Sequence, residues 1–269
     1  MKLKLAGRPS AEMPFLDHLE ELRWRILWSL AAILIGSIIG FVIVTPSFHP
    51  EAIRFDVIAL LKQPLDPYLE GGKLLALSVT TPFFITLKLA IAVGIILAAP
   101  IIVYHAWSFL SPALLPQERR AIVPALYLGM ILFAAGVALA YFLVLPFSIR
   151  FMLGFLGESL EPAITADAYF GFVTLMLVAF GAVFELPVVV LILSALGLVT
   201  SAFLKSKRRY AVAVGGVVAC VITPGDYLTV SLFMMVPLLL LYELGIGLAR
   251  LVERARERKS SAEALPEAM

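Results

Sequence analysis

The charged residues before the first apolar run combine acids and arginines at helical spacing, so they could either pair with each other or bind a ligand. Within residues 15–26, "FLDHLEELRWRI", Glu21 stands four residues before Arg25. Side chains four apart lie on the same face of a helix, so this carboxylate and guanidinium can form an ion pair, and Glu20 can pair with Arg23. Periodicity alone therefore favours a solvated helix start with self-paired charges.

A second acid in a similar setting is Glu118, in the segment "WSFLSPALLPQERRAIVP". Pro112 and Pro116 break the preceding helix, and Glu118 follows in the first turn of the next one. The helix dipole favours an acid at that position, which by itself could account for Glu118. The distribution of basic residues, described below, places Glu118 on the same side of the membrane as Glu21, so the two carboxylates can share one face.

Glu185, in "FGAVFELPVVV", is an ionisable residue within a long apolar run. A charged side chain at the centre of a membrane helix costs about 2.5–3.5 kcal/mol on insertion scales, so its presence needs a reason. Pro187 lies two residues later and predicts a kink. Two interpretations stay open: Glu185 faces a polar groove or a partner helix, or it is a protonated or paired residue that holds helices together. Lys88 and Glu243 lie nearer helix ends, where pairing or snorkelling is expected.

Metal, nucleotide and enzymatic sites have little support in the sequence. His18, His49 and His105 lie in different segments, and Cys220 is the single cysteine. We find neither a phosphate-binding glycine loop nor a protease motif. We therefore predict a protein that is not an enzyme and has no metal, no cofactor and no nucleic-acid partner.

The elements that carry these residues are expected to be transmembrane helices. Hydrophobic residues make up 61% of the 269 residues and charged residues 15%, with a mean hydropathy of +1.00, which indicates an all-α polytopic membrane protein. The fifth run reaches about 20 Å at about 1.5 Å per residue, less than the hydrocarbon thickness, and the sixth is also short. The six predicted spans are residues 26–44, 83–104, 121–145, 169–198, 210–222 and 230–248.

Basic residues predict the orientation. Of the 21 Lys and Arg residues, 16 lie in the N-terminal arm, the second and fourth loops and the tail, so the positive-inside rule places both termini in the cytoplasm. The long loop 45–81 is expected to form a folded cap on the outer face. We predict one domain, 1–269, with a disordered tail at 253–269.

Several stretches together resemble the TatC family, the multi-spanning subunit of the twin-arginine protein translocase. They follow the family's order from residue 18 to about residue 250. They are "HLEELRWR", "PFFITLKLA", "AAPIIVYHAWSFLSPALLPQERR", "AYFLVLP", "FGAVFELPVVV", "KRRYAVAVGGVVACVITPGD" and "VPLLLLYELG". The resemblance implies a receptor in the cytoplasmic membrane that binds twin-arginine signal peptides and exports folded proteins, driven by the proton-motive force. It also implies single-span TatA/TatB-type partner subunits, contact with membrane lipids and a homo-oligomeric working complex.

The resemblance also implies roles for individual residues. Glu21 and Glu118 match the acids implicated in recognising the arginine pair, and a carboxylate can contact a guanidinium at two points. The other residues matched to that site are Phe109, Arg23 and Arg120. Pro64 matches a proline that shapes the outer loop, with Pro112 and Pro187 as further structural prolines. Glu185 matches a residue in a concave groove. The family's glutamine near the start of span six is absent here, so a partner-docking region near the turn between spans five and six would use Thr223, Thr229 or Ser231, with Asp226 capping that turn.

Two other classes of function stay open at this point. A small-solute or ion transporter could use Glu185 and Lys88 as an intramembrane relay. A scaffold that gathers other membrane proteins would need neither residue. Discontinuous helices that meet at mid-membrane would favour the transporter, and the sequence shows no such pair.

Overall fold

The computed structural model describes residues 15–45, 56–69, 73–110, 122–155, 163–222 and 229–263. Within these ranges the regular elements are all helical, so the prediction of an all-α fold is confirmed there. One isolated bridge between Leu75 and Thr165 joins the segment before the helix Thr81–Leu110 to the segment before the helix Ala166–Val183. The helices are α1 (Phe15–Val44), α2 (Val57–Lys62), η3 (Asp66–Tyr68), α3 (Thr81–Leu110), α4 (Ile122–Leu139), the π-helix η7 (Ala140–Val144), α5 (Leu145–Phe155), α6 (Ala166–Val183), α7 (Leu186–Ala195), α8 (Ser201–Ser206), α9 (Arg208–Ile222) and α10 (Thr229–Glu263).

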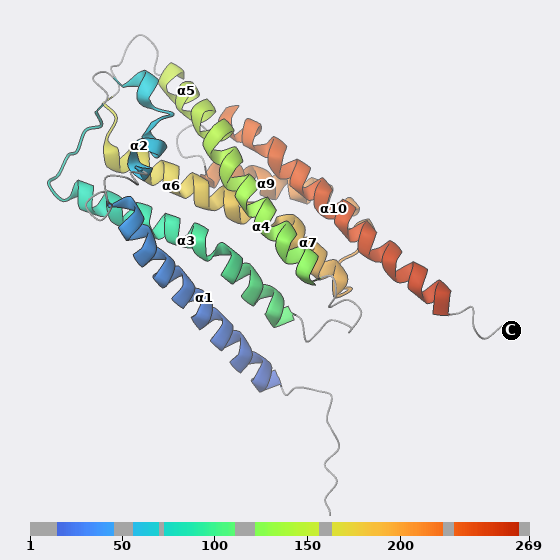
Figure 1. Cartoon of the computed structure of the whole chain (residues 1–269). Helices are drawn as coiled ribbons and strands as arrows, with labels where there is room; N and C mark the ends of the chain where they lie inside the picture. The colour runs from blue at the N-terminus through green and yellow to red at the C-terminus, as the bar shows by residue number, and fades with distance from the viewer. Residues whose placement is uncertain are drawn as a thin grey trace, which may run out of the picture.

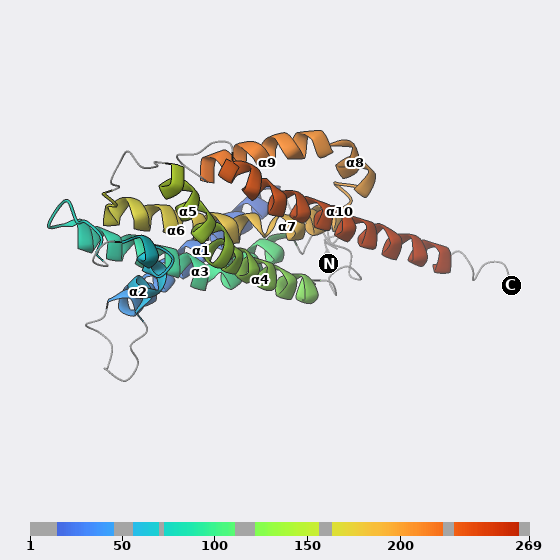
Figure 2. The same cartoon turned by 90° about the horizontal axis from the view of Figure 1, so that it is seen from above.

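The long helices run between two ends of the molecule (Figure 1). At one end α1 begins and α3, α7 and α10 end, and we call it the terminal end. The opposite end carries α2, and we call it the capped end. α1 packs mainly against α3 at one edge, while α10 packs against α7, α8 and α9. Figure 2 shows α8 and α9 on the side of the bundle opposite α2. The core lies around α6, where Val173 and Met176 are fully buried.

Five of the described helical segments are long and apolar enough to cross a membrane: Leu19–Val44, Thr81–Phe109, Pro124–Gly154, Ala166–Ala195 and Met234–Glu257. The predicted fifth run lies in α9, which has 15 residues. The expectation of a short sixth helix is corrected by α10, which has 35 residues. The same helix reaches Glu263, so it extends into the segment 253–269 for which we expected disorder.

Side-chain contacts with α7 and α8 account for the length of α10. Glu253 accepts hydrogen bonds from the backbone N–H of Ser201 at 2.6 Å and from its hydroxyl at 2.5 Å. Arg256 donates to the carbonyl oxygen of Ala195 at the end of α7. These bonds occupy polar groups at two neighbouring helix termini, which would otherwise need water or capping side chains. Glu253 and Arg256, beyond the apolar part of α10, therefore have partners that a count of apolar residues does not show.

The predicted kink at Pro187 is confirmed as a break between α6 and α7. α6 ends at Val183, Phe184 and Glu185 form a turn, and Pro187 occupies the first turn of α7. Proline lacks a backbone N–H and clashes with the preceding turn, so the helix restarts at this position, where the missing donor costs little. The break directs the Glu185 side chain away from the helix axis of α6 and towards α3 and α4.

Glycine residues allow α1 and α3 to approach until their backbones touch. A Cβ atom added at Gly36 would lie 2.6 Å from the carbonyl oxygen of Gly94, and one added at Gly94 would lie 2.4 Å from the backbone nitrogen of Ser37. Gly40 makes the same kind of contact with Ala90, at 2.4 Å from its carbonyl oxygen. Gly36 and Gly40 are four residues apart, the spacing at which small residues line a membrane helix interface. This seam fixes α1 against α3 and so positions the residues at its terminal end.

At the other end, tyrosine hydroxyls from η7 and α6 hold α2 in place. Tyr141 donates to the carbonyl oxygen of Leu60 at 2.7 Å, and Tyr169 donates to that of Leu61 at 2.6 Å. Pro64 follows α2 in the turn that leads to η3, and Leu65 beside it is 2% exposed. α2 and η3 are thus a structured part of loop 45–81, whose residues 46–55 and 70–72 lie outside the described ranges.

Candidate functional site

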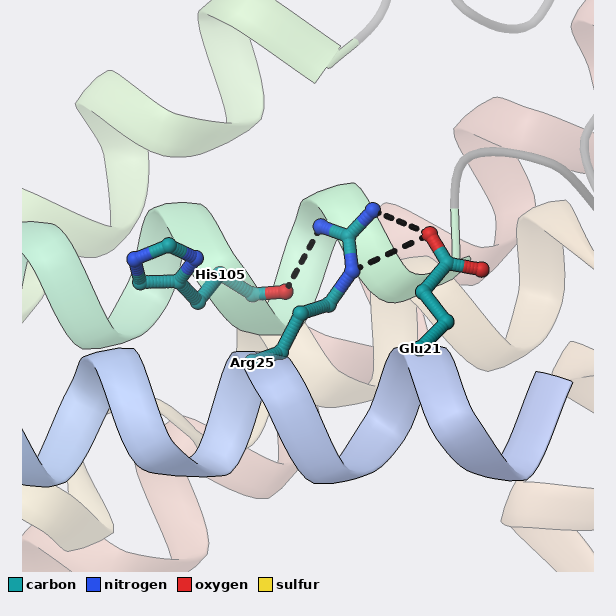
Figure 3. Close-up of polar contacts among 3 residues, drawn as sticks. All are labelled: Glu21, Arg25 and His105. Atoms are coloured by element: carbon teal, nitrogen blue, oxygen red, sulfur yellow. Dashed lines mark hydrogen bonds and ion pairs between the residues drawn. The ribbon is translucent and has the colours of Figure 1, made fainter. Parts of the chain in front are cut away.

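The Glu21 carboxylate at the terminal end of α1 binds a guanidinium (Figure 3). Arg25 donates to Glu21 Oε1 from Nε at 3.2 Å and also from Nη2. The same guanidinium reaches across to α3, where its Nη1 donates to the carbonyl oxygen of His105 at 3.5 Å. The ion pair predicted from the spacing of Glu21 and Arg25 is confirmed. The hydrogen bond from Arg25 to His105 joins α1 to α3.

This pair lies near the surface of the protein. The side chains of Arg25 and Glu21 are 20% and 25% exposed, so the pair is partly accessible, although Glu21 Oε2 itself is buried. A partly exposed pair of this kind contributes about 0–1 kcal/mol, because water screens the charges and two long side chains lose freedom. A second guanidinium of similar geometry could therefore replace Arg25 at little net cost.

The other residues predicted for this site are less fully described. Arg23 is exposed, and among the described residues no ion pair joins it to Glu20. Phe109 lies in the last turn of α3 and is half-buried. Pro112, Glu118 and Arg120 lie outside the described residues.

Arg25 and the His105 carbonyl are the additions that the structure makes to the predicted site. Arg25 was identified from the sequence as a partner of Glu21 and not as part of the site. The contact with His105 joins residues 80 apart in the chain, and it depends on the glycine seam. The spacing of Gly36 and Gly40 was the available signal for that packing.

Glu185, in the turn before α7, lines an apolar pocket of about 460 Å³ formed mainly by α3, α4 and η7. Its carboxylate abuts Gly129 of α4, where an added Cβ would lie 3.0 Å from Oε2. Oε1 is buried and has no hydrogen-bond partner among the described residues. Pro100, Phe133 and Tyr141 also line this pocket. A buried polar atom without a partner is costly, so its position beside this pocket favours contact with a ligand, a partner group or water.

The other ionisable residues of the apolar runs are paired. Lys88 Nζ lies 2.6 Å from Asp167 Oδ1, and Arg208 Nη2 lies 2.7 Å from Glu243 Oε2. The pairing expected for Lys88 and Glu243 is confirmed. Lys88 is not among the residues that line the Glu185 pocket, so the relay that a transporter would need receives no support.

The predicted docking residues lie away from the Glu185 pocket in the sequence and are described only in part. Thr223 and Asp226 lie outside the described residues. Thr229 and Ser231 belong to the first turn of α10, and the structure does not describe their side chains. No cluster of His, Cys, Asp and Glu suited to a metal ion occurs within the described ranges.

Comparison with known proteins decides the family. The family model described as "Sec-independent protein translocase protein (TatC)" matches residues 17–237 of the chain. The chain belongs to the TatC family. This membership makes it a multi-pass membrane protein of the Sec-independent protein translocase, which is a transport system and not an enzyme.

Individual relatives match over almost the whole chain. The TatC protein of Aquifex aeolicus is 38% identical over 252 residues, which cover 93% of this chain and 100% of the relative. The TatC protein of Carboxydothermus hydrogenoformans is 40% identical over 250 residues, 92% of this chain and 98% of the relative. A solved structure described as "Twin Arginine Translocase Receptor- TatC" superposes with a TM-score of 0.74 at 38% identity and covers 88% of this chain and 99% of that one.

Proposed function

We propose that this protein is the receptor subunit of a twin-arginine translocase and that it binds twin-arginine signal peptides at the terminal end of the bundle. The observation that carries the proposal is the contact between Glu21 and a guanidinium, which Arg25 supplies within the chain. A carboxylate in this setting can accept the same contact from an arginine of a signal peptide. The solved relative described as a twin-arginine translocase receptor supports the same conclusion.

The residues around Glu21 have complementary proposed roles. Glu118 is the second carboxylate, so each acid would bind one of the two arginines. Arg23 and Arg120 would orient these acids, and Phe109, half-buried at the end of α3, would pack on the peptide.

The route across the membrane involves partner subunits in this proposal. α9 would be a sixth span, short at about 22 Å for its 15 residues. Both termini would lie in the cytoplasm, and the copies would assemble into an oligomer. Single-span TatA/TatB-type helices would dock near the turn between α9 and α10, where Thr223, Asp226, Thr229 and Ser231 lie in the sequence. The proton-motive force would drive transport, and Glu185 would act in the groove during that step.

Photo-crosslinking of a twin-arginine precursor tests the recognition step. A crosslinker placed beside the arginine pair of the precursor is activated in membranes that hold the wild type, Glu21→Gln or Glu118→Gln. We expect each substitution to lower the yield of the crosslink strongly, because a charge-assisted contact contributes about 1.5–3 kcal/mol.

Glu20→Gln provides the matched control, since Glu20 is an exposed acid next to Glu21. Its crosslink yield should equal that of the wild type. Wild-type yields in both Glu21→Gln and Glu118→Gln would overturn the proposed recognition site.

A further inference from the structure

A second apolar pocket lies on the α9 side of the bundle, away from Glu21. It has a volume of about 530 Å³ and is formed by α6, α7, α9 and α10, which is within the size range of sites for small ligands. From α9 it is lined by Ala211, Val214, Gly215 and Val218, which share one face of the helix. An added Cβ at Gly215 would come no closer than 4.0 Å to Leu238 of α10. The pocket therefore has room for a further apolar group.

The terminal end of this pocket carries positive charge. Lys207 is the charged residue among the described side chains that line it, and it lies in the turn between α8 and α9. The Lys207 ammonium lies 5.2 Å from the ring centre of Tyr210, and the Arg209 guanidinium lies 4.9 Å from the same ring centre. Arg209 also donates to the Tyr210 hydroxyl at 3.2 Å. Two cations thus share one aromatic ring, and Tyr210 itself lines the pocket.

Neither of these cations has an acidic partner among the described residues, whereas their neighbour Arg208 is paired with Glu243 at 2.7 Å. Contact with an aromatic face is favourable for a cation, but it does not cancel the repulsion between two like charges. An anion between Lys207 and Arg209 would relieve that repulsion. Tyrosine and basic residues at a helix end are typical of the level of the lipid headgroups.

We propose that this pocket binds an anionic phospholipid, with an acyl chain against α9 and α10 and the headgroup phosphate between Lys207 and Arg209. The apolar lining fits an acyl chain, and basic pockets between membrane helices bind anionic headgroups. α9 has 15 residues and is shorter than the hydrocarbon core. If α9 spans the membrane, this short length would place the two cations at its start close to the hydrocarbon core.

A lipid fits this site better than another protein segment does. A second copy of the chain in a symmetric contact would bring Lys207 and Arg209 towards the same cations of its partner. The docking residues proposed for a partner helix lie at the other end of α9, beyond Ile222. Lipid binding at this pocket is independent of arginine recognition by Glu21, so failure of either one leaves the other unaffected.

Native mass spectrometry of the full-length protein tests the proposal. The purified protein is incubated in detergent with equal amounts of phosphatidylglycerol, which is anionic, and phosphatidylcholine, which is neutral. We expect the wild type to retain phosphatidylglycerol about 25-fold more than phosphatidylcholine, given about fivefold for each of the two cations. The double variant Lys207→Gln/Arg209→Gln should retain the two lipids about equally. Gly215→Leu, which fills the pocket, should retain less of both.

Two matched controls test whether loss of any nearby cation, or any larger side chain on α9, lowers lipid retention. Lys205→Gln removes a neighbouring cation that does not line the pocket, and Val217→Leu enlarges an α9 side chain that is 64% exposed outside it. Both should retain lipid as the wild type does. Equal retention of the two lipids by the wild type, or undiminished phosphatidylglycerol in the double variant, would overturn the proposal. So would a bound second copy in place of lipid, or displacement of the lipid by glycerol phosphate, which carries the phosphate without the acyl chains.

Discussion

Glu21 is already occupied by a guanidinium within its own helix. Arg25 contacts Glu21 Oε1 through two nitrogens and holds the carbonyl oxygen of His105 with the third. This arrangement keeps the carboxylate in place while no ligand is bound. An incoming arginine would then compete with Arg25 for this carboxylate.

Removal of Arg25 should therefore strengthen binding of a twin-arginine peptide. For Arg25→Gln we expect affinity about two- to fivefold higher, since a partly exposed pair contributes up to about 1 kcal/mol. Fluorescence anisotropy of a labelled peptide on protein in nanodiscs measures this change. Arg254→Gln removes an exposed cation at the same end and should leave the affinity unchanged. Weaker binding in Arg25→Gln would mean that Arg25 supports the site and does not compete for it.

Glu185 differs from Glu21 in having a buried oxygen with no hydrogen-bond partner among the described residues. A group of this kind lowers stability unless a ligand or water satisfies it. If the role of Glu185 is structural, removal of the carboxylate should lower thermal stability. If its role is in transport, removal should leave thermal stability equal or raise it.

For Glu185→Leu and Glu185→Gln we expect export to fall severalfold while the melting temperature in detergent stays equal or rises. Binding of a signal peptide should remain within about twofold of the wild type, because the pocket and the Glu21 site are separate. Export assays in cells and thermal unfolding of the purified variants give the two readings. A lower melting temperature with normal export would assign Glu185 a structural role.

The α1–α3 pair is the element on which the Glu21 site depends. Few residues of α1 are buried, and the helix packs mainly on α3. The seam at Gly36, Gly40 and Gly94 has no room for a Cβ atom. Any side chain there must separate the helices, and the His105 carbonyl would then move away from Arg25.

Gly94→Ala should therefore destabilise the protein by about 1–3 kcal/mol, the usual cost of overpacking, and weaken binding of a twin-arginine peptide. Thermal unfolding and anisotropy measure the two effects on one preparation. Gly171→Ala is the matched control, because an added Cβ at Gly171 meets no atom within 4 Å. If Gly94→Ala behaved as Gly171→Ala does, the seam would not position the site.

Local patterns predicted the features that depend on neighbouring residues. Pro187 predicted the break between α6 and α7, and the spacing of Glu21 and Arg25 predicted their ion pair. The length of α10 was not predicted, because it depends on contacts with Ser201 and Ala195 from other helices. The hydroxyl of Tyr169 reaches a carbonyl 108 residues away, and such a partner cannot be identified from periodicity.

At the scale of the whole molecule, the candidate functional residues are divided between distinct regions. The terminal end holds Glu21 with Arg25, the pocket formed mainly by α3, α4 and η7 holds Glu185, and α2 at the other end is bonded to Tyr141 and Tyr169. All of these regions lie within residues 17–237, which match the TatC family of protein translocase subunits. In the proposed mechanism recognition occurs at one end, while the transport step involves the Glu185 pocket.

The most direct test of the proposed recognition compares peptides that carry twin arginine or twin lysine. Their dissociation constants are measured on the wild type, Glu21→Gln and the control Glu20→Gln. The wild type and the control should prefer twin arginine, because lysine cannot make the two-point contact. Glu21→Gln should bind twin arginine about tenfold or more weakly, with a smaller preference over twin lysine. An unchanged affinity and preference in Glu21→Gln would contradict the account.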